Sequence, residues 1–240
     1  MLKRISSLLF GDFRLISRDP MLYVLFAAPV MTVLIIRFGM PVVSSLLVQH
    51  LQFNLLPFLP FINTFLALIQ AMLAGMLFGF IALDERDEGV IAAISVTPVA
   101  RSGYIYYRLV IAALFSMLFF SIVMAGGGYV QLSFFRMSLM TLIASVNGAF
   151  YLLFLASTAD NKVEGLALSK LGGLVFFAPI AGFFLPPVWR FPMMVFPTYW
   201  VVPVLTASDR SLLLFIPLMG LVFVAWFSLL FRWFGKKVLL

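Results

Sequence analysis

Most of this chain consists of long apolar runs, each of the length needed to cross a lipid bilayer. A helical span needs about 20 apolar residues, and six such runs cover residues 21–43, 58–83, 105–130, 137–158, 165–184 and 211–231. The composition agrees, since 64% of the residues are hydrophobic and 10% are charged, against about half and about a quarter in soluble domains. We therefore predict an all-α polytopic membrane protein with six transmembrane helices, forming a single transmembrane domain over residues 1–240.

The first twenty residues form a separate, amphipathic segment. Apolar side chains recur at spacings of three and four residues, at Leu2, Ile5, Leu9, Phe13 and Ile16, which is the pattern of one helix face. Because the basic side chains fall mostly off that face, the helix can lie on an anionic leaflet and contact membrane lipids. We predict an interfacial amphipathic helix over residues 1–20.

Charge is concentrated in one stretch between the second and third spans. Four of the nine acidic residues stand together here, and such a group cannot lie in hydrocarbon. They are Asp84, Glu85, Asp87 and Glu88. A short apolar helix edge follows and ends at Thr97-Pro98, since the residue before a proline leaves the α region. We interpret residues 84–104 as a water-exposed docking element for a soluble partner, and an ordinary solvated loop is the alternative.

Residues 185–210 are apolar and aromatic, yet they cannot form a continuous spanning helix. Five prolines lie between positions 186 and 203, and each one removes a backbone donor and clashes with the preceding turn. We predict short helical pieces that re-enter the membrane from its outer side, with Trp189, Tyr199 and Trp200 at the depth of the lipid headgroups.

The distribution of lysine and arginine predicts the orientation. With a cytoplasmic N-terminus, twelve of the sixteen basic residues fall on the cytoplasmic side and four fall outside, in agreement with the positive-inside rule. Both termini and residues 84–104 are then cytoplasmic, and residues 185–210 are extracellular. We expect a multi-pass protein of a bacterial plasma membrane. The protein has a net charge of +7, and we expect its basic residues to contact anionic lipid rather than nucleic acid.

A few polar side chains interrupt the apolar spans. Asn63 and Gln70 are seven residues apart and share one face of the second span, and Asn147 and Tyr151 share one face of the fourth. Such residues line a transport path or bond a neighbouring helix, so the four form a possible substrate path. The second span also carries a stripe of small residues at intervals of four, which favours close packing against another helix.

Little in the sequence supports catalysis. There is no cysteine, and the one histidine, His50, falls in a predicted outer loop. No metal-ligand pairing, nucleophile motif or Gly-x-x-x-x-Gly-Lys phosphate loop occurs, so we expect no catalytic residue, metal site or cofactor in this chain. If the protein transports a molecule, we expect the energy to come from another subunit.

In its layout and in several short motifs, the chain resembles the ABC-2 type of ABC transporter permeases. The motifs are Arg18-Asp19-Pro20, Glu88-Gly89, Thr97-Pro98, Arg101, Tyr104 and Arg108. The resemblance implies that residues 1–20 are a connecting helix, and that residues 84–104 carry a coupling helix held in a cleft of a cytoplasmic ATPase subunit. The ATPase-facing residues that it implies are Glu85, Arg86, Glu88, Gly89, Thr97, Pro98 and Arg101. ATP and Mg²⁺ would bind to that partner subunit.

A narrower set of residues is similar to permeases for fluoroquinolone or multidrug export. The set comprises Glu88-Gly89, Val96-Thr97-Pro98, Tyr104 and Pro197-Thr198-Tyr199-Trp200. We hypothesise that two such chains pair as a homodimer or heterodimer and export a hydrophobic or amphipathic cargo, such as a drug-like molecule or a lipid. The cargo path would lie at the dimer seam.

Three alternatives stay open. A self-sufficient secondary transporter or channel would use a polar pathway formed by Asn63, Gln70, Asn147 and Lys170. A non-transporting membrane scaffold would bind its partner through residues 84–104 without cycling. A haem or lipid exporter within the ABC class is the third.

Overall fold

The computed structural model describes residues 2–90 and 100–238, which are helices joined by short turns, with no strand in that part of the chain. Six of its helical stretches are long and apolar enough to cross a membrane. They are Pro20–Leu51, Leu56–Asp87, Gly103–Gly127, Phe134–Thr158, Lys162–Phe184 and Asp209–Trp233. The prediction of an all-α polytopic membrane protein is confirmed.

Three helices form the centre of the bundle: α4 (Leu59–Asp87), α6 (Ala100–Gly127) and α7 (Phe134–Thr158). The small-residue stripe of the second span lets α4 approach α7. A Cβ atom on Gly75 would overlap the backbone of Gly148, and one on Gly79 would meet the side chain of Leu155. The Ser116 hydroxyl of α6 donates to the Ala71 carbonyl beside this crossing, at 2.9 Å. The stripe is therefore a packing surface, as close helix contact in membranes requires.

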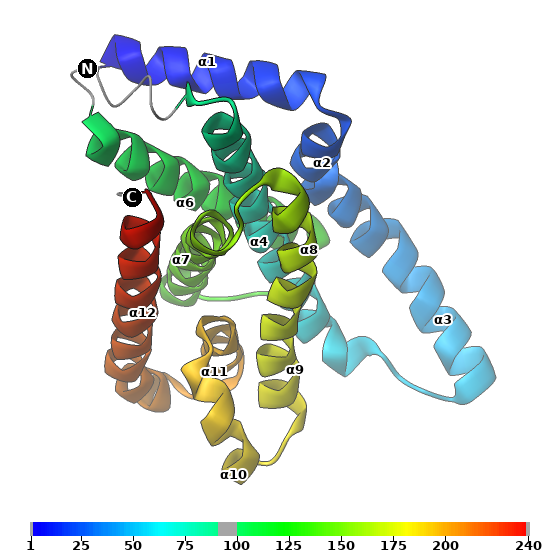
Figure 1. Cartoon of the computed structure of the whole chain (residues 1–240). Helices are drawn as coiled ribbons and strands as arrows, with labels where there is room; N and C mark the ends of the chain where they lie inside the picture. Colours follow the sequence, from blue (N-terminus) through cyan, green and yellow to red (C-terminus); the bar gives the residue numbers. More distant parts are fainter. Residues whose placement is uncertain (1, 91–99, 239–240) are drawn as a thin grey trace.

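Helix α1 (Leu2–Arg18) lies across the end of the bundle at which both termini are found (Figure 1). Ile16 is buried against the bundle, whereas Phe10 and Phe13 are exposed. The chain then turns into α2 (Pro20–Leu34) at Asp19, whose carboxylate accepts the Met21 N–H at 2.8 Å. This side-chain cap, followed by proline in the first turn, is a strong helix start.

The first span is longer than the sequence indicates. We predicted its end at residue 43, but α2 passes through a π-helical turn, η1 (Ile35–Gly39), into α3 (Met40–Leu51). The helix tolerates Pro41 because this proline follows the π-turn and lies in the first turn of α3. It ends only at Gln52, which adopts a left-handed conformation with φ of 51°. In Figure 1, α3 projects away from the other helices, and none of its described residues is buried.

The fifth span is interrupted. It consists of α8 (Lys162–Gly172), a 3₁₀ turn η3 (Gly173–Phe176) and α9 (Phe177–Phe184). Pro179 has no N–H for the Val175 carbonyl, and the Thr198 hydroxyl donates to that carbonyl at 2.7 Å. A segment distant in sequence thus satisfies the backbone where the span changes its winding.

Residues 185–208 fold back into the bundle as short helical pieces. They are α10 (Pro187–Arg190), η4 (Phe191–Val195), η5 (Pro197–Trp200) and α11 (Val201–Thr206). Two of the three aromatic residues that we expect at headgroup depth face the protein interior, and the depth of all three in the membrane stays a prediction. Tyr199 and Trp200 are buried in the protein, and Tyr199 packs on Gly182, whose missing side chain makes the room. Trp189 is exposed.

A short 3₁₀ turn, η2 (Leu56–Phe58), precedes α4, and the last described helix is α12 (Asp209–Val238). At the end of the bundle away from α1, Arg136 of α7 joins α11 to α12. Its guanidinium donates to the Val204 and Ala207 carbonyls and pairs with Asp209, at 2.9, 2.6 and 2.6 Å. Arg136 therefore caps the C-terminal end of α11 and fixes the start of α12.

Candidate functional site

A buried ion network joins three elements at the end of the bundle covered by α1. Arg108 of α6 is 2% exposed and contacts Asp12 of α1 and Glu85 of α4. Its Nη1 lies 2.8 Å from Asp12 Oδ1, and its Nε lies 3.1 Å from Glu85 Oε2, while Nη2 contacts Oε1 of the same glutamate. One guanidinium thus holds the interfacial helix and the ends of two spans together.

Two tyrosines complete this network, which we call the Arg108 network (Asp12, Glu85, Tyr104, Tyr107 and Arg108). The Tyr107 hydroxyl donates to Asp12 Oδ2 at 2.6 Å, and the Tyr104 hydroxyl donates to Glu85. Both rings also lie near the guanidinium, with its carbon 5.4 Å from the centre of the Tyr104 ring and 5.3 Å from that of Tyr107. Buried charges need such full hydrogen bonding, because an unpaired one is costly.

A second ion cluster lies at the same end of the bundle. Lys162, at the start of α8, places its Nζ 2.6 Å from Asp19 and 2.7 Å from Asp84. The hydrogen bond from Lys162 lowers the pKa of the Asp19 carboxyl below its usual value, although partial burial opposes the shift. Asp19 also caps α2. The cluster therefore ties the starts of the first and fifth spans to the end of α4.

Arg86 is bonded within the chain as well. Its guanidinium donates to the Ala156 carbonyl at 3.3 Å and to the Ala159 carbonyl. These are carbonyls at the C-terminal end of α7, which a cation stabilises. The structure thus gives Glu85 and Arg86, two of the residues expected to face an ATPase, internal partners on neighbouring helices.

The remaining residues of the predicted coupling element divide into exposed and undescribed positions. Asp87 and Glu88 are exposed where α4 ends, and Gly89 has φ of 71°, a conformation that favours glycine. Thr97 and Pro98, with the short surface helix predicted around them, lie outside the described residues. Arg101 lies in the first turn of α6. Contact of these residues with an ATPase stays a prediction.

The four polar residues of the possible substrate path do not lie together. Asn63 packs against α6, where its Nδ2 lies 3.7 Å from the Met124 sulfur. Gln70 donates to the Thr32 hydroxyl of α2 at 2.7 Å. Both side chains are buried, and the amide oxygen of each has no hydrogen-bond partner among the described residues. They bond neighbouring helices, which is the packing interpretation of such residues.

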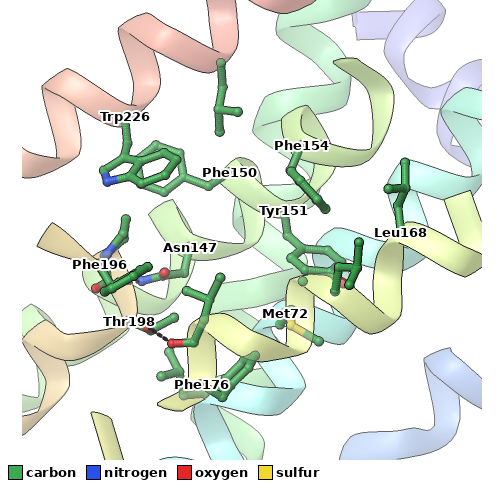
Figure 2. Close-up of a pocket in the computed structure, with 16 residues that line it drawn as sticks. Met72, Asn147, Phe150, Tyr151, Phe154, Leu168, Phe176, Phe196, Thr198 and Trp226 are labelled. Atoms are coloured by element: carbon green, nitrogen blue, oxygen red, sulfur yellow. Dashed lines mark hydrogen bonds between the residues drawn. The ribbon is translucent and has the colours of Figure 1, made fainter. Parts of the chain in front are cut away.

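Asn147 and Tyr151 instead line a cavity of about 370 Å³ (Figure 2). The Asn147 amide donates to the Ile143 carbonyl at 2.8 Å and to the Pro197 carbonyl at 3.4 Å. The Tyr151 hydroxyl donates to the Ser169 carbonyl at 2.8 Å, where Gly172 leaves room for the ring. The residues that line the cavity come from α4, α7, the interrupted fifth span, η5 and α12.

Several residues of both regions were not singled out as site residues in the sequence. Asp12 and Lys162 belong to the ion clusters, and Thr198 and Trp226 to the cavity wall. Arg108 was noted for the resemblance alone, although a charge inside an apolar span marks a buried partner. Among the described residues, no group of three or more His, Asp or Glu side chains could hold a metal ion.

Comparisons with known proteins agree with this layout. The family model described as fluoroquinolones export permease protein Rv2686c-like matches residues 12–232. Two relatives from Mycobacterium tuberculosis are the fluoroquinolones export permease proteins MT2760 (strain CDC 1551 / Oshkosh) and Rv2686c (strain ATCC 25618 / H37Rv). Each is 30% identical over 205 residues, which cover 84% of this chain and 81% of the relative. No solved structure matches. The chain belongs to the Rv2686c-like family of fluoroquinolones export permease proteins.

Proposed function

We propose that this chain is the membrane subunit of an ATP-driven exporter of drug-like molecules, of the ABC-2 type, powered by a separate ATPase. The proposal rests on membership of a family named for fluoroquinolones export permeases. The family name supplies the class of cargo, and the six candidate spans are what a permease needs to cross the membrane. The sequence has no phosphate-binding loop of its own. ATP and Mg²⁺ therefore bind to the partner, and this chain works as one of a pair of permeases.

The end of the bundle at α1 is the proposed coupling end, facing the cytoplasm. Asp87, Glu88 and Gly89 are exposed there and available for a partner. The Arg108 network would transmit force from this surface, since a push on the end of α4 also moves α1 and α6. Ion-paired, closely packed elements shift as a unit and so suit a two-state lever.

The secondary-transporter alternative receives less support. It would use Asn63, Gln70, Asn147 and Lys170 as one pathway. Asn63 contacts α6, and Gln70 contacts α2. Asn147 of α7 lines the cavity, and Lys170 is exposed. Within residues 2–90 and 100–238, these side chains do not face one another across a common channel.

A pull-down from native membranes in mild detergent tests the proposal. The tagged chain should retain a soluble ATPase, and a variant with residues 88–99 replaced by a glycine-serine linker should lose it. The replacement begins at residue 88 because Glu85 and Arg86 have partners inside the chain. The control replaces residues 52–55, at the opposite end of α4, with the same kind of linker and should keep the ATPase.

Two results would contradict the proposal. If no ATPase accompanies the intact chain, its energy source lies elsewhere. If the ATPase is lost only with residues 52–55 replaced, the coupling end has been assigned to the wrong side of the membrane.

A further inference from the structure

We propose that the cavity between α8 and α12 is a cargo site within a single chain, entered from the lipid, which holds a neutral aromatic molecule with a hydrogen-bond donor. This inference rests on the proposed function and moves the cargo from the dimer seam into the subunit. The cavity volume, about 370 Å³, lies in the range of small-molecule sites, roughly 300–1,000 Å³.

The cavity extends from the bundle interior to the outer surface of the helices. Phe150 and Tyr151 of α7 form its floor and are 6% and 7% exposed. Leu171 of α8 belongs to the same wall and is 58% exposed. In Figure 1, α8 and α12 lie on either side of α7, and both are peripheral helices of the bundle. A molecule dissolved in the bilayer can therefore reach the floor between them.

The lining favours flat, uncharged rings. Six lining residues are aromatic, and none of the described lining residues is charged. Aromatic rings pack well on other rings in offset or edge-on arrangements, and they adapt little because they have few rotatable bonds. An isolated charge would lose its hydration here without a counter-charge. The cavity thus selects the neutral form of an aromatic molecule.

One polar group gives the site a direction. Asn147 is 8% exposed, and its Nδ2 is held by the Ile143 and Pro197 carbonyls. These two bonds fix the orientation of the amide, so that Oδ1 is left as an acceptor without a partner among the described residues. In Figure 2, Asn147 lies beside Phe196 and Thr198, at the η5 side of the cavity. A cargo N–H or O–H group at that end would satisfy the amide oxygen.

Two leucines of the fifth span provide a matched test. Leu171 lines the cavity, and Leu174, one turn further on, does not; they are 58% and 59% exposed. The probe is a fluorescent fluoroquinolone whose carboxylic acid is converted to a primary amide and whose amine is acylated, so that it is uncharged and keeps an N–H donor. Equilibrium dialysis of this probe against the purified full chain in lipid nanodiscs measures binding without any ATPase. Leu171→Trp should weaken binding by about tenfold, because a larger side chain overfills the site. Leu171→Phe should have a smaller effect, and Leu174→Trp should bind like the unmodified chain.

The outcomes separate this proposal from the proposed function. Equal binding by Leu171→Trp and Leu174→Trp at unchanged thermal stability overturns the cavity site, as does an absence of binding by the unmodified chain. A spin-labelled fatty acid that binds in a Leu171-dependent way, when the fluoroquinolone does not, makes the cavity a lipid site and also overturns the proposal. In each of these cases, retention of an ATPase in the pull-down would leave the exporter function standing.

Discussion

At the scale of single residues, Arg108 has the largest expected effect on stability. Arg108→Gln removes the cation from between Asp12 and Glu85 and leaves two buried carboxylates with tyrosine partners only. Breaking a buried ion pair from one side costs about 3–5 kcal/mol. The thermal unfolding midpoint in detergent should fall by several degrees, whereas Arg210→Gln, at an exposed site, should leave it nearly unchanged. Equal midpoints for the two variants would show that the Arg108 network is not a structural joint.

The close packing of α4, α6 and α7 around Gly148 gives a second prediction at this scale. Gly148→Ala places a methyl group against Ser116 and close to the Ala71 carbonyl, so α4, α6 and α7 must separate. We expect a loss of about 1–3 kcal/mol from overpacking. Gly220→Ala is the control, because nothing lies within 4 Å of its added methyl group, and alanine favours the helix by up to about 1 kcal/mol. A lower unfolding midpoint for Gly220→Ala than for Gly148→Ala would contradict this account of the packing.

The sequence predicted residue roles where one physical requirement decides them. The small residues Ala71, Gly75 and Gly79 favoured close helix packing, and they lie where α4 approaches its neighbours. The roles of Glu85 and Arg86 were not predictable, because their partners Arg108 and Ala156 are 23 and 70 residues away. Charged residues at the end of a span indicate that water is nearby. They do not show whether a given carboxylate is exposed to that water or paired with an arginine inside the protein.

At the scale of elements, η5 is expected to stabilise the interruption in the fifth span. Thr198→Val keeps the size of the side chain but leaves the Val175 carbonyl without the hydroxyl donor that lies 2.7 Å away. The expected loss is about 1–3 kcal/mol, the cost of an unsatisfied buried acceptor. Thr206→Val, at an exposed position bonded within its own helix, serves as the control for the unfolding midpoint. Equal unfolding midpoints for the two variants would show that η5 does not stabilise the interruption in the fifth span.

The existence of the helices was predictable, but where they bend was not. Apolar runs of spanning length show that a span exists, since the backbone must be satisfied internally in lipid. The first span continues through η1 to Leu51 because serine and glutamine near its end are compatible with a helix. The fifth span changes its winding at η3, where the Thr198 hydroxyl supplies a donor. Such tertiary hydrogen bonds leave no local signal in the sequence.

At the scale of the whole molecule, the coupling end should control transport without controlling folding. Replacing Glu88 and Arg101 together by alanine is expected to lower drug export by about tenfold, a coupling loss near 1.4 kcal/mol. Membrane insertion and the unfolding midpoint should not change. Gln49→Ala, on the exposed outer part of α3, is the control. Normal export by the double variant, measured as drug accumulation in cells, would show that these residues do not couple the subunits.

The class of the whole molecule followed from composition and periodicity, and the internal cavity did not. Residues 137–158 and 185–210 were predicted separately, as a span and as a re-entrant segment. In the fold, Asn147 and Tyr151 from the first of these meet Pro197 and Thr198 from the second around the cavity. The site is assembled from five segments that are distant in sequence. It depends on how the helices pack, and that packing cannot be predicted from a single sequence.

The central claim, export of a drug by this chain with energy from ATP, is tested most directly in inverted membrane vesicles. Vesicles from cells with the chain and from cells lacking it are given a fluorescent fluoroquinolone, ATP and an ionophore that collapses the proton gradient. We predict ATP-dependent uptake that persists with the ionophore and is absent without the chain. Uptake that requires the proton gradient and not ATP, or equal uptake in both kinds of vesicle, would contradict the account.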